Sequence, residues 1–174
     1  MTSRGIRREP IYSNDGDRRM FMAFLAQSIY KCRWTCLGYC LMTNHYHVLL
    51  SLSSANLSKG MHRLNGVYAR RFNEIHGYTG HLFDARFSAS LIETDEHFLE
   101  ASRYVALNPV KAGLCDDPAD WPWSSFRAIA GLEPCPRFLA AARVRRAFGR
   151  GTSGAELYAS FVRGRVAVLP GTHP

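Results

Sequence analysis

Two short runs of strand-forming residues, separated by a polar dipeptide, give the clearest local pattern in the chain. The first run covers residues 34–42, the second runs from His45 through Leu52, and Thr43-Asn44 lies between them. Alternating apolar and polar positions favour a strand with one buried face, and a short polar link favours a hairpin. The pattern therefore predicts an antiparallel hairpin whose second strand begins at His45.

Two segments on either side of this hairpin repeat apolar residues at helical spacing. The earlier one follows Asp15 and Asp17, either of which can cap a helix. The later one covers residues 57–76 and is followed by Gly77, a residue that commonly ends helices. Both segments have one apolar stripe, which predicts amphipathic helices that pack on a core. The stripes are Met20, Phe21, Phe24, Leu25 and Ile29 in the first, and Leu57, Met61, Leu64, Tyr68, Phe72 and Ile75 in the second.

A third helix is predicted between two sequence signals. Thr94 or Asp95 can cap its first turn. Pro109 disfavours the helical conformation at Asn108, so we expect the helix to end near Leu107.

The remaining segments complete a recognisable order of elements. Residues 2–12 resemble a short edge strand followed by a turn, and residues 82–93 alternate well enough to form another strand. The order is then βαββαβ followed by a helix, which predicts an α+β fold with a ferredoxin-like antiparallel sheet and helices packed on one face.

The C-terminal part has a different character. Trp121–Phe126 resembles an aromatic anchor before a short helix, and two arginine-rich, weakly amphipathic segments follow at Phe138–Phe148 and Gly154–Val162. We divide the chain into a domain over residues 1–132 and a basic helical tail over residues 133–174. The last eight residues are expected to be disordered.

Composition limits the class of protein. The chain has 174 residues, of which 47% are hydrophobic, and no apolar run is long enough to cross a bilayer. The N-terminal stretch is basic and lacks the apolar core of a signal peptide. The five cysteines form no Cys-x-x-Cys pair. We therefore expect free thiols and a cytoplasmic protein.

Positive charge is unevenly distributed. The formal net charge is +8, and from Arg137 onward there are seven arginines against one acidic residue, Glu156. A basic tail beside a nearly balanced body is expected of a nucleic-acid-binding protein, although a need for solubility also explains part of the excess.

His45 and His47 are candidate metal ligands. Side chains two residues apart on a strand project from the same face, so both imidazoles point to one place while Tyr46 and Val48 point to the other face. Neutral imidazoles bind divalent cations well. The alternative is that the two histidines merely complete a hairpin strand, and two ligands alone do not make a metal site.

Tyr104 and Asn108 lie four residues apart on the third predicted helix and therefore share one face. If that face covers the histidines, a phenol, an amide oxygen and two imidazoles come together. A metal ion there can orient a phosphate while the phenolic oxygen attacks phosphorus. Each residue also has a simpler explanation: Tyr104 as a half-buried helical aromatic and Asn108 as the residue that ends the helix before Pro109.

Four short motifs occur in order along the chain. They are Met42–Leu50 (MTNHYHVLL), Gly80–Phe87 (GHLFDARF), Tyr104–Leu114 (YVALNPVKAGL) and Trp121–Phe126 (WPWSSF). Together they closely resemble the REP-associated tyrosine transposases, which are single-tyrosine members of the HUH (His-hydrophobe-His) endonuclease superfamily. The resemblance covers about residues 2–132, and four motifs in the same order are far more specific than any one of them.

The resemblance implies a site and a reaction. Tyr104 corresponds to the nucleophile, His45 and His47 to the metal ligands, and Asn108 to a third ligand, for Mg²⁺ or Mn²⁺. The implied substrate is single-stranded DNA next to a foldback hairpin, cut to give a 5′-phosphotyrosine and a free 3′-hydroxyl, and the implied state is a monomer. Candidate contacts to the DNA backbone are Arg4, Arg7, Arg8, Arg86, Arg143, Arg145 and Arg146.

Two other functions remain open from the sequence. The same sheet topology serves RNA-recognition domains, so an inactive relative can bind hairpin DNA or RNA without cutting it. A replication initiator or relaxase would use the same HUH chemistry, but those proteins are commonly larger. The occurrence of His45, His47, Tyr104 and Asn108 in one chain favours the transposase.

Overall fold

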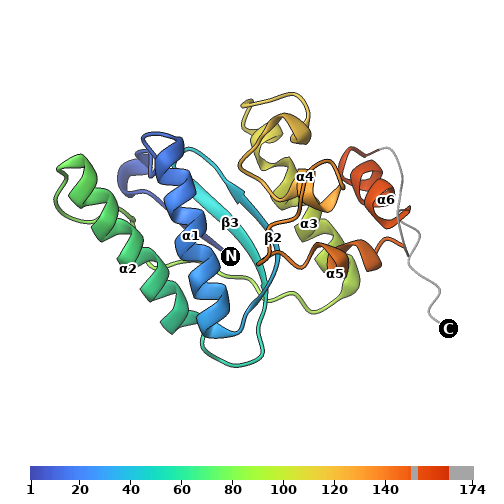
Figure 1. The fold of residues 1–174 in the computed structure, drawn as a ribbon, viewed down its shortest axis with the longest axis horizontal. Helices are drawn as coiled ribbons and strands as arrows, with labels where there is room; N and C mark the ends of the chain where they lie inside the picture. The colour runs from blue at the N-terminus through green and yellow to red at the C-terminus, as the bar shows by residue number, and fades with distance from the viewer. Residues whose placement is uncertain (150–152, 165–174) are drawn as a thin grey trace.

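The computed structural model describes residues 1–149 and 153–164. Its centre is an antiparallel sheet of three strands in the order β1-β3-β2, with helices on both faces (Figure 1). The strands are β1 (Thr2–Arg4), β2 (Thr35–Leu41) and β3 (His45–Ser51). In the described part of the chain, no helix is both long enough and apolar enough to cross a membrane.

The predicted hairpin is confirmed. Strands β2 and β3 pair with Tyr39 opposite Val48 and Cys40 opposite His47, and β1 pairs with the other edge of β3. β3 is therefore the central strand, held by backbone hydrogen bonds on both sides. Tyr46 and Val48 are buried on one face, as the alternation predicts.

Two long helices cover that face of the sheet. They are α1 (Asp15–Cys32) and α2 (Leu57–His76). The ring of Phe21 on α1 lies 4.6 Å from that of Tyr46 between centroids, and the Tyr46 hydroxyl donates to Asn65 on α2. Both helices pack through their predicted apolar stripes except at Ile75, which is 51% exposed near the end of α2. Gly77 ends α2 in the left-handed conformation with a φ of 67°. The ferredoxin-like arrangement of these elements is confirmed.

The cap of α1 differs from the prediction. Asn14, rather than Asp15 or Asp17, is the N-cap, and its side chain accepts from the Asp17 backbone N–H at 3.2 Å. The Asp17 carboxylate in turn accepts from the Asn14 N–H at 3.2 Å, which completes a capping box. Asp17 therefore stabilises the first turn from inside the helix.

The predicted fourth strand over residues 82–93 is wrong as a continuous element. This segment makes only isolated antiparallel bridges to the N-terminal strand region, Ser88 with Thr2 and Phe83 with Gly5. The segment runs along the outer edge of β1, where a fourth ferredoxin-like strand would lie. Because β1 is only three residues long, it offers too few backbone groups for a continuous ladder with residues 82–93.

The opposite face of the sheet is also covered, which the prediction of helices on one face missed. Helix α3 (Asp95–Lys111) packs there, with Val105 against Cys40, Met42 and Trp121. This face buries apolar side chains of its own, so it cannot be left exposed to water.

Helix α3 begins as predicted but ends later. Thr94 caps it, accepting from the His97 N–H at 3.1 Å. It continues through Pro109 to Lys111, because proline removes only one N–H donor and the last turn is closed by the Ala112 N–H bonded to the Asn108 carbonyl at 3.0 Å. Asn108 therefore lies within the helix, one turn after Tyr104.

Short elements follow α3 and pack beside it. Residues 139–140 of the predicted tail pair with β2, since the Ala140 N–H donates to the Cys36 carbonyl at 2.8 Å, and Tyr158 is buried in the main core. The division at residue 132 stays a prediction, and the last eight residues lie outside the described part. The short elements after α3 are η2 (Pro118–Asp120), α4 (Phe126–Ile129), α5 (Ala141–Arg146) and α6 (Ser153–Val162), while η1 (Ile6–Arg8) follows β1 near the start of the chain.

Candidate active site on the central strand

The two histidines of β3 lie side by side at the start of the central strand. The ring centroids of His45 and His47 are 4.9 Å apart, and the rings are nearly perpendicular. His45 pairs with Arg4 of β1, and His47 pairs with both Thr2 and Cys40. Because backbone pairing fixes the strand from both sides, the two imidazoles are held close together without help from a ligand.

A chain of hydrogen bonds determines which ring nitrogen of His45 carries the proton. The Asn44 side-chain nitrogen donates to the Arg8 backbone carbonyl at 2.8 Å, which orients its amide. The Asn44 Oδ1 then lies 2.7 Å from His45 Nδ1. An amide oxygen can only accept, so Nδ1 must carry the proton and Nε2 must carry the free lone pair. His45 is thereby prepared to bind a cation through Nε2.

Burial keeps both histidines neutral. It lowers the pKa of His47 to about 3, assisted by nearby positive charge that includes Arg4. Burial and then Arg4 also lower the pKa of His45. The Nε2 of His47 is buried and has no hydrogen-bond partner among the described residues. Each imidazole therefore has one lone pair available at neutral pH, and the Nε2 atom of His47 lacks a hydrogen-bond partner among the described residues.

Helix α3 brings Tyr104 to this pair. The Tyr104 and His47 rings form a T-shaped pair, with 5.4 Å between their centroids and an angle of 90° between their planes. Tyr104 is 48% exposed, so its hydroxyphenyl group is accessible at the surface. The Lys111 ammonium lies 5.0 Å from the Tyr104 ring centroid.

Asn108 lies one helical turn from Tyr104 and is buried. Its side-chain nitrogen donates to the Tyr104 backbone carbonyl at 2.7 Å. The nitrogen is thus engaged by the helix itself, which leaves the amide oxygen as the acceptor that can bind a cation. The structure therefore brings His45, His47 and Tyr104 together and places Asn108 one helical turn after Tyr104.

The donor set fits a divalent cation with open coordination positions. Two neutral imidazoles and one amide oxygen are suitable ligands, and the unpaired Nε2 of His47 is the polar atom that such an ion would satisfy. No cluster of three or more histidine, cysteine, aspartate or glutamate side chains occurs in residues 1–149 and 153–164. A site with so few protein ligands leaves positions for water and substrate oxygens, unlike a closed structural zinc site.

The predicted DNA-contacting arginines fall into two groups. Arg4, Arg7, Arg8 and Arg86 are exposed on β1, on η1 and on the segment that runs beside β1. The structure thus places these four on elements at the β1 edge of the sheet, where Arg4 pairs with His45.

The second group of arginines is on α5 and is not uniform. Arg143 and Arg146 are exposed. Arg145 instead donates to the backbone carbonyls of Ile129 and Ala128, at 2.8 and 2.6 Å. Its guanidinium stabilises the end of α4 and is committed within the protein.

Sequence reasoning missed Lys111 and Asn44. Lys111 lies seven residues after Tyr104, a spacing that places both on one helical face, but the expected helix end at Leu107 hid this relation. Asn44 was assigned only to the hairpin turn, and nothing local indicated that its partner is the Arg8 carbonyl.

Comparison with known proteins places the chain in a family. A family model described as "Transposase IS200 like" matches residues 3–108, which is more than half of the chain and includes all four site residues. The chain belongs to the IS200-like transposase family.

A solved structure has the same fold. It is described as "Structure of the REP associates tyrosine transposase bound to a REP hairpin". The match has a TM-score of 0.64 and 20% sequence identity, and it covers 76% of this chain and 79% of the other. A search of curated proteins found no match. The family and the fold expected from the four motifs are thus both confirmed.

Proposed function

We propose that this IS200-like transposase is a metal-dependent enzyme that cuts and rejoins single-stranded DNA next to hairpins, with Tyr104 as the nucleophile. The observation that carries the proposal is the contact between an accessible tyrosine on α3 and a pair of neutral histidines on β3, one of which has a ring nitrogen without a hydrogen-bond partner in the described part of the chain. A structural role alone does not explain why a buried imidazole nitrogen beside an exposed tyrosine lacks a partner.

The site residues have distinct roles in this proposal. His45, His47 and the Asn108 oxygen would hold Mg²⁺ or Mn²⁺, and the ion supplies Lewis acidity and orientation for the phosphate. The Tyr104 oxygen forms a bond to phosphorus and gives up its proton to solvent. The bond from phosphorus to the 3′ oxygen breaks, and that oxygen takes up a proton to give a free 3′-hydroxyl.

The product would be a 5′-phosphotyrosine. Because this ester keeps the energy of the original phosphodiester, a second 3′-hydroxyl can reverse the reaction and join the strands. Lys111 supports this chemistry by placing a positive charge beside the Tyr104 ring, where negative charge develops as the phenol loses its proton.

The family, the charge and the structural match support the proposed substrate. The chain carries a formal net charge of +8, and four exposed arginines surround the edge of the sheet near His45. The structurally similar protein is described as bound to a REP hairpin. We propose hairpin DNA of repeated palindromic elements as the partner here too. A cytoplasmic location and a monomeric state stay predictions.

The decisive experiment compares the wild type with Tyr104→Phe on hairpin DNA that has single-stranded flanks. With Mn²⁺ or Mg²⁺, we expect the wild type to form a covalent adduct on a denaturing gel. A label at the DNA 3′ end should travel with the protein, and a label at the 5′ end should appear in a shortened free strand. Tyr104→Phe should give no adduct but should still bind the hairpin.

The matched control is Tyr30→Phe, which changes a tyrosine on α1 that is 85% exposed. It should form the adduct at the wild-type level. If the wild type binds hairpin DNA but yields neither adduct nor nick with either metal, the catalytic proposal is wrong and the protein is a hairpin-binding module. An adduct that persists in Tyr104→Phe would assign the nucleophile elsewhere.

A further inference from the structure

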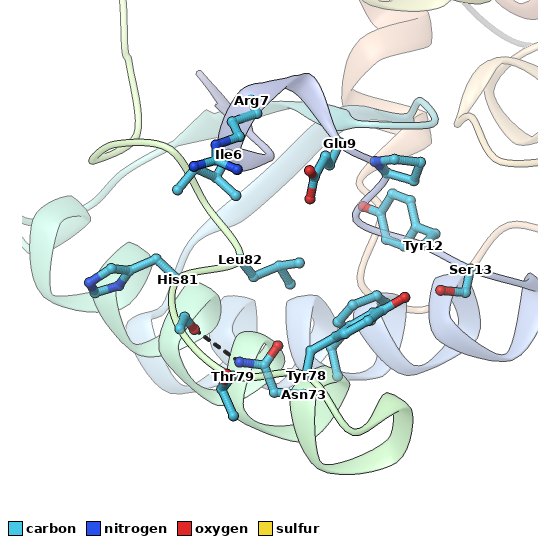
Figure 2. A pocket seen from close by; sticks show the side chains of 13 residues that line it. Ile6, Arg7, Glu9, Tyr12, Ser13, Asn73, Tyr78, Thr79, His81 and Leu82 are labelled. Atoms are coloured by element: carbon cyan, nitrogen blue, oxygen red, sulfur yellow. Dashed lines mark hydrogen bonds between the residues drawn. The ribbon is translucent and has the colours of Figure 1, made fainter.

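Two concave surfaces of the described chain lie away from the histidines and have no role in the proposed chemistry. The first has a volume of about 720 Å³ and lies between η1, the end of α2 and residues 78–82 (Figure 2). Arg7 and Glu9 both line it, so its charge favours neither anions nor cations. The second, the basic groove, has a volume of about 810 Å³ and is lined by the end of α1, residues 33–35 and residues 137–140. Its side chains select a ligand more clearly.

Three cations surround the basic groove. Lys31 lies in the last turn of α1, Arg33 follows that helix, and Arg137 comes from the segment before α5. All three side chains are exposed, and none forms an ion pair within residues 1–149 and 153–164. No acidic side chain among the described residues lines the groove. The groove therefore attracts negative charge that the protein itself does not supply there.

The backbone at Arg33 supports a role for its side chain. Arg33 follows the last residue of α1 and has a φ of 54°, in the left-handed region that favours glycine. A residue with a side chain is strained in this conformation. Within the described residues, Arg33 has no ion pair that would offset the strain. Contact of its guanidinium with a ligand would explain why an arginine occupies this position.

Between the cations, the basic groove is apolar. Ala26, Phe138 and Ala140 line it and are partly exposed. The nearly buried side chains of Ile29 and Leu139 line it too. An apolar side chain of a ligand can therefore be buried here while charged groups beside it reach the cations.

Long-range contacts fix both walls of the basic groove. On one wall, the Trp34 N–H donates to the Ile29 carbonyl at 2.9 Å, and the Trp34 indole donates to the Asn56 side chain at 2.6 Å. On the other wall, the Ala140 N–H donates to the Cys36 carbonyl at 2.8 Å. The groove is therefore formed before a ligand arrives, which lowers the entropy lost on binding.

The basic groove is remote from the candidate active site. It lies at Thr35, the first residue of β2, whereas His47 pairs with Cys40 near the other end of that strand. At about 3.3 Å per residue, these two points on β2 are about 16 Å apart. Leu139 bridges β2 on the side away from β3, so the groove also lies at the opposite edge of the sheet from the arginines around β1. A hairpin bound at β1 and the histidines does not need this groove.

A protein segment fits the basic groove better than nucleic acid does. A phosphate backbone would match the charge but has no apolar side chain for the lining, whereas an acidic segment with one apolar residue matches both. Arginine and aromatic residues, which line this groove, are also enriched in protein–protein interfaces. The end of this chain does not match, because residues 165–174 contain no aspartate or glutamate.

We propose that the basic groove binds an acidic segment of a partner protein. Carboxylates of that segment pair with Lys31, Arg33 and Arg137, and one apolar side chain lies against Phe138 and Ala140. The proposal adds a protein partner to a chain whose proposed substrate is DNA, and it does not depend on the proposed catalysis.

The test measures fluorescence anisotropy of a labelled synthetic peptide that has two glutamates on each side of a leucine. At about 0.15 M salt, the full chain should bind this peptide but not the matching lysine peptide. Replacing the leucine by glycine should weaken binding by roughly tenfold or more, because a buried apolar side chain is lost. Arg33→Ala and Arg137→Ala should each weaken binding by roughly twofold to fivefold, as the loss of an exposed ion pair does.

Two further variants separate binding from folding and from overall charge. Arg33→Gly should weaken peptide binding as Arg33→Ala does without lowering the unfolding temperature, because glycine suits the left-handed backbone. Arg19→Ala is the matched control, since Arg19 is an exposed arginine on α1 outside the groove. It removes the same charge and should bind the peptide as the wild type does.

Four outcomes would overturn the inference. It is wrong if the glutamate peptide does not bind, or if Arg19→Ala weakens binding as strongly as Arg33→Ala. It is also wrong if an oligonucleotide of equal charge binds with the same dependence on Arg33 and Arg137, because the groove is then a nucleic-acid site. Self-association of the wild type that is lost in Arg137→Glu, measured by light scattering, would assign the groove to a second copy of this chain instead.

Discussion

A single side-chain amide, that of Asn44, connects the backbone of η1 to a candidate metal ligand. Its nitrogen is fixed by the Arg8 carbonyl, so its oxygen faces His45 Nδ1 and determines which ring nitrogen is protonated. Hydrogen bonds of this kind orient metal-binding histidines in many proteins and make the free nitrogen a better ligand. At the scale of the residue, Asn44 is therefore as much a part of the site as His45.

Replacing Asn44 should weaken metal binding without unfolding the protein. Asn44→Ala removes the acceptor for His45 Nδ1, so we expect roughly 10–100-fold weaker Mn²⁺ binding. Electron paramagnetic resonance of free Mn²⁺ measures this affinity. In the metal-free protein, ¹⁵N NMR should show His45 protonated on Nδ1 in the wild type and shifted toward Nε2 in the variant.

Asn44→Asp is the conservative comparison, because it keeps an oxygen acceptor for His45. It should retain the Nδ1-protonated ring and bind Mn²⁺ more tightly than Asn44→Ala. Equal Mn²⁺ affinity in the wild type and Asn44→Ala would show that this hydrogen bond does not support the site.

At the scale of the element, α3 carries several site residues on one helix, whereas the arginines of α5 differ in their surroundings. Continuing past Pro109, α3 keeps Tyr104, Asn108 and Lys111 on one rigid element. In α5, the arginines at 143 and 146 face solvent while Arg145 turns inward to the end of α4. The sequence assigned all three α5 arginines to DNA, but their geometry separates them.

The arginines of α5 should therefore differ when they are mutated. Arg145→Ala removes two charge-assisted hydrogen bonds to backbone carbonyls, so we expect the free energy of unfolding to fall by about 1.5–3 kcal/mol. Urea denaturation measures this change. Arg143→Ala and Arg146→Ala should change stability by less than about 0.5 kcal/mol.

The exposed arginines should instead affect DNA binding. If each side chain contacts a phosphate, Arg143→Ala and Arg146→Ala should each reduce the slope of log affinity for the hairpin against log salt concentration by about 1. The division of roles among the α5 arginines is wrong if Arg145→Ala unfolds at the same urea concentration as the wild type. It is also wrong if Arg143→Ala or Arg146→Ala destabilises the protein as strongly as Arg145→Ala does.

At the scale of the whole molecule, the C-terminal segments complete the sheet and the core. Residues 139–140 hydrogen-bond to the edge of β2, and Tyr158 of α6 is buried against Phe126 and Phe148. Arg163 makes a bidentate ion pair with Asp117, at 2.7 and 2.9 Å, over the Phe126 ring. These contacts join the predicted tail to the body.

Removing residues 133–174 should therefore destabilise the body. The truncation uncovers the β2 edge and apolar side chains such as Phe126, so we expect residues 1–132 to unfold at lower temperature or to aggregate. In the full chain, Tyr158→Ala should cost about 3–5 kcal/mol, as for other large aromatic deletions in a core. Thermal unfolding followed by circular dichroism should show one cooperative transition.

A matched full-chain variant separates packing from charge. Arg146→Ala removes a tail cation without touching the core and should unfold at the wild-type temperature. If residues 1–132 alone unfold at the wild-type temperature, the tail is an independent unit and the division of the chain at residue 132 is physical.

The sequence by itself determined the local elements and the family. Alternation over residues 45–52 placed His45 and His47 on one face, helical periodicity gave α1 and α2, and four motifs in order identified the transposase family. The first two depend on spacing between neighbours, which backbone geometry converts directly into a shared face. The family depends instead on the resemblance of the four motifs to known transposases. Spacing made the four site residues candidates, and the resemblance of the motifs implied their roles.

Only the tertiary structure decided what those faces meet. It placed Tyr104 against His47, left the Nε2 of His47 without a hydrogen-bond partner within residues 1–149 and 153–164, and showed two isolated bridges where a strand over residues 82–93 was predicted. It also directed Arg145 into the protein. These outcomes depend on long-range packing and on which backbone groups still need partners. Such information is a property of the whole fold, so no local pattern of residues contains it.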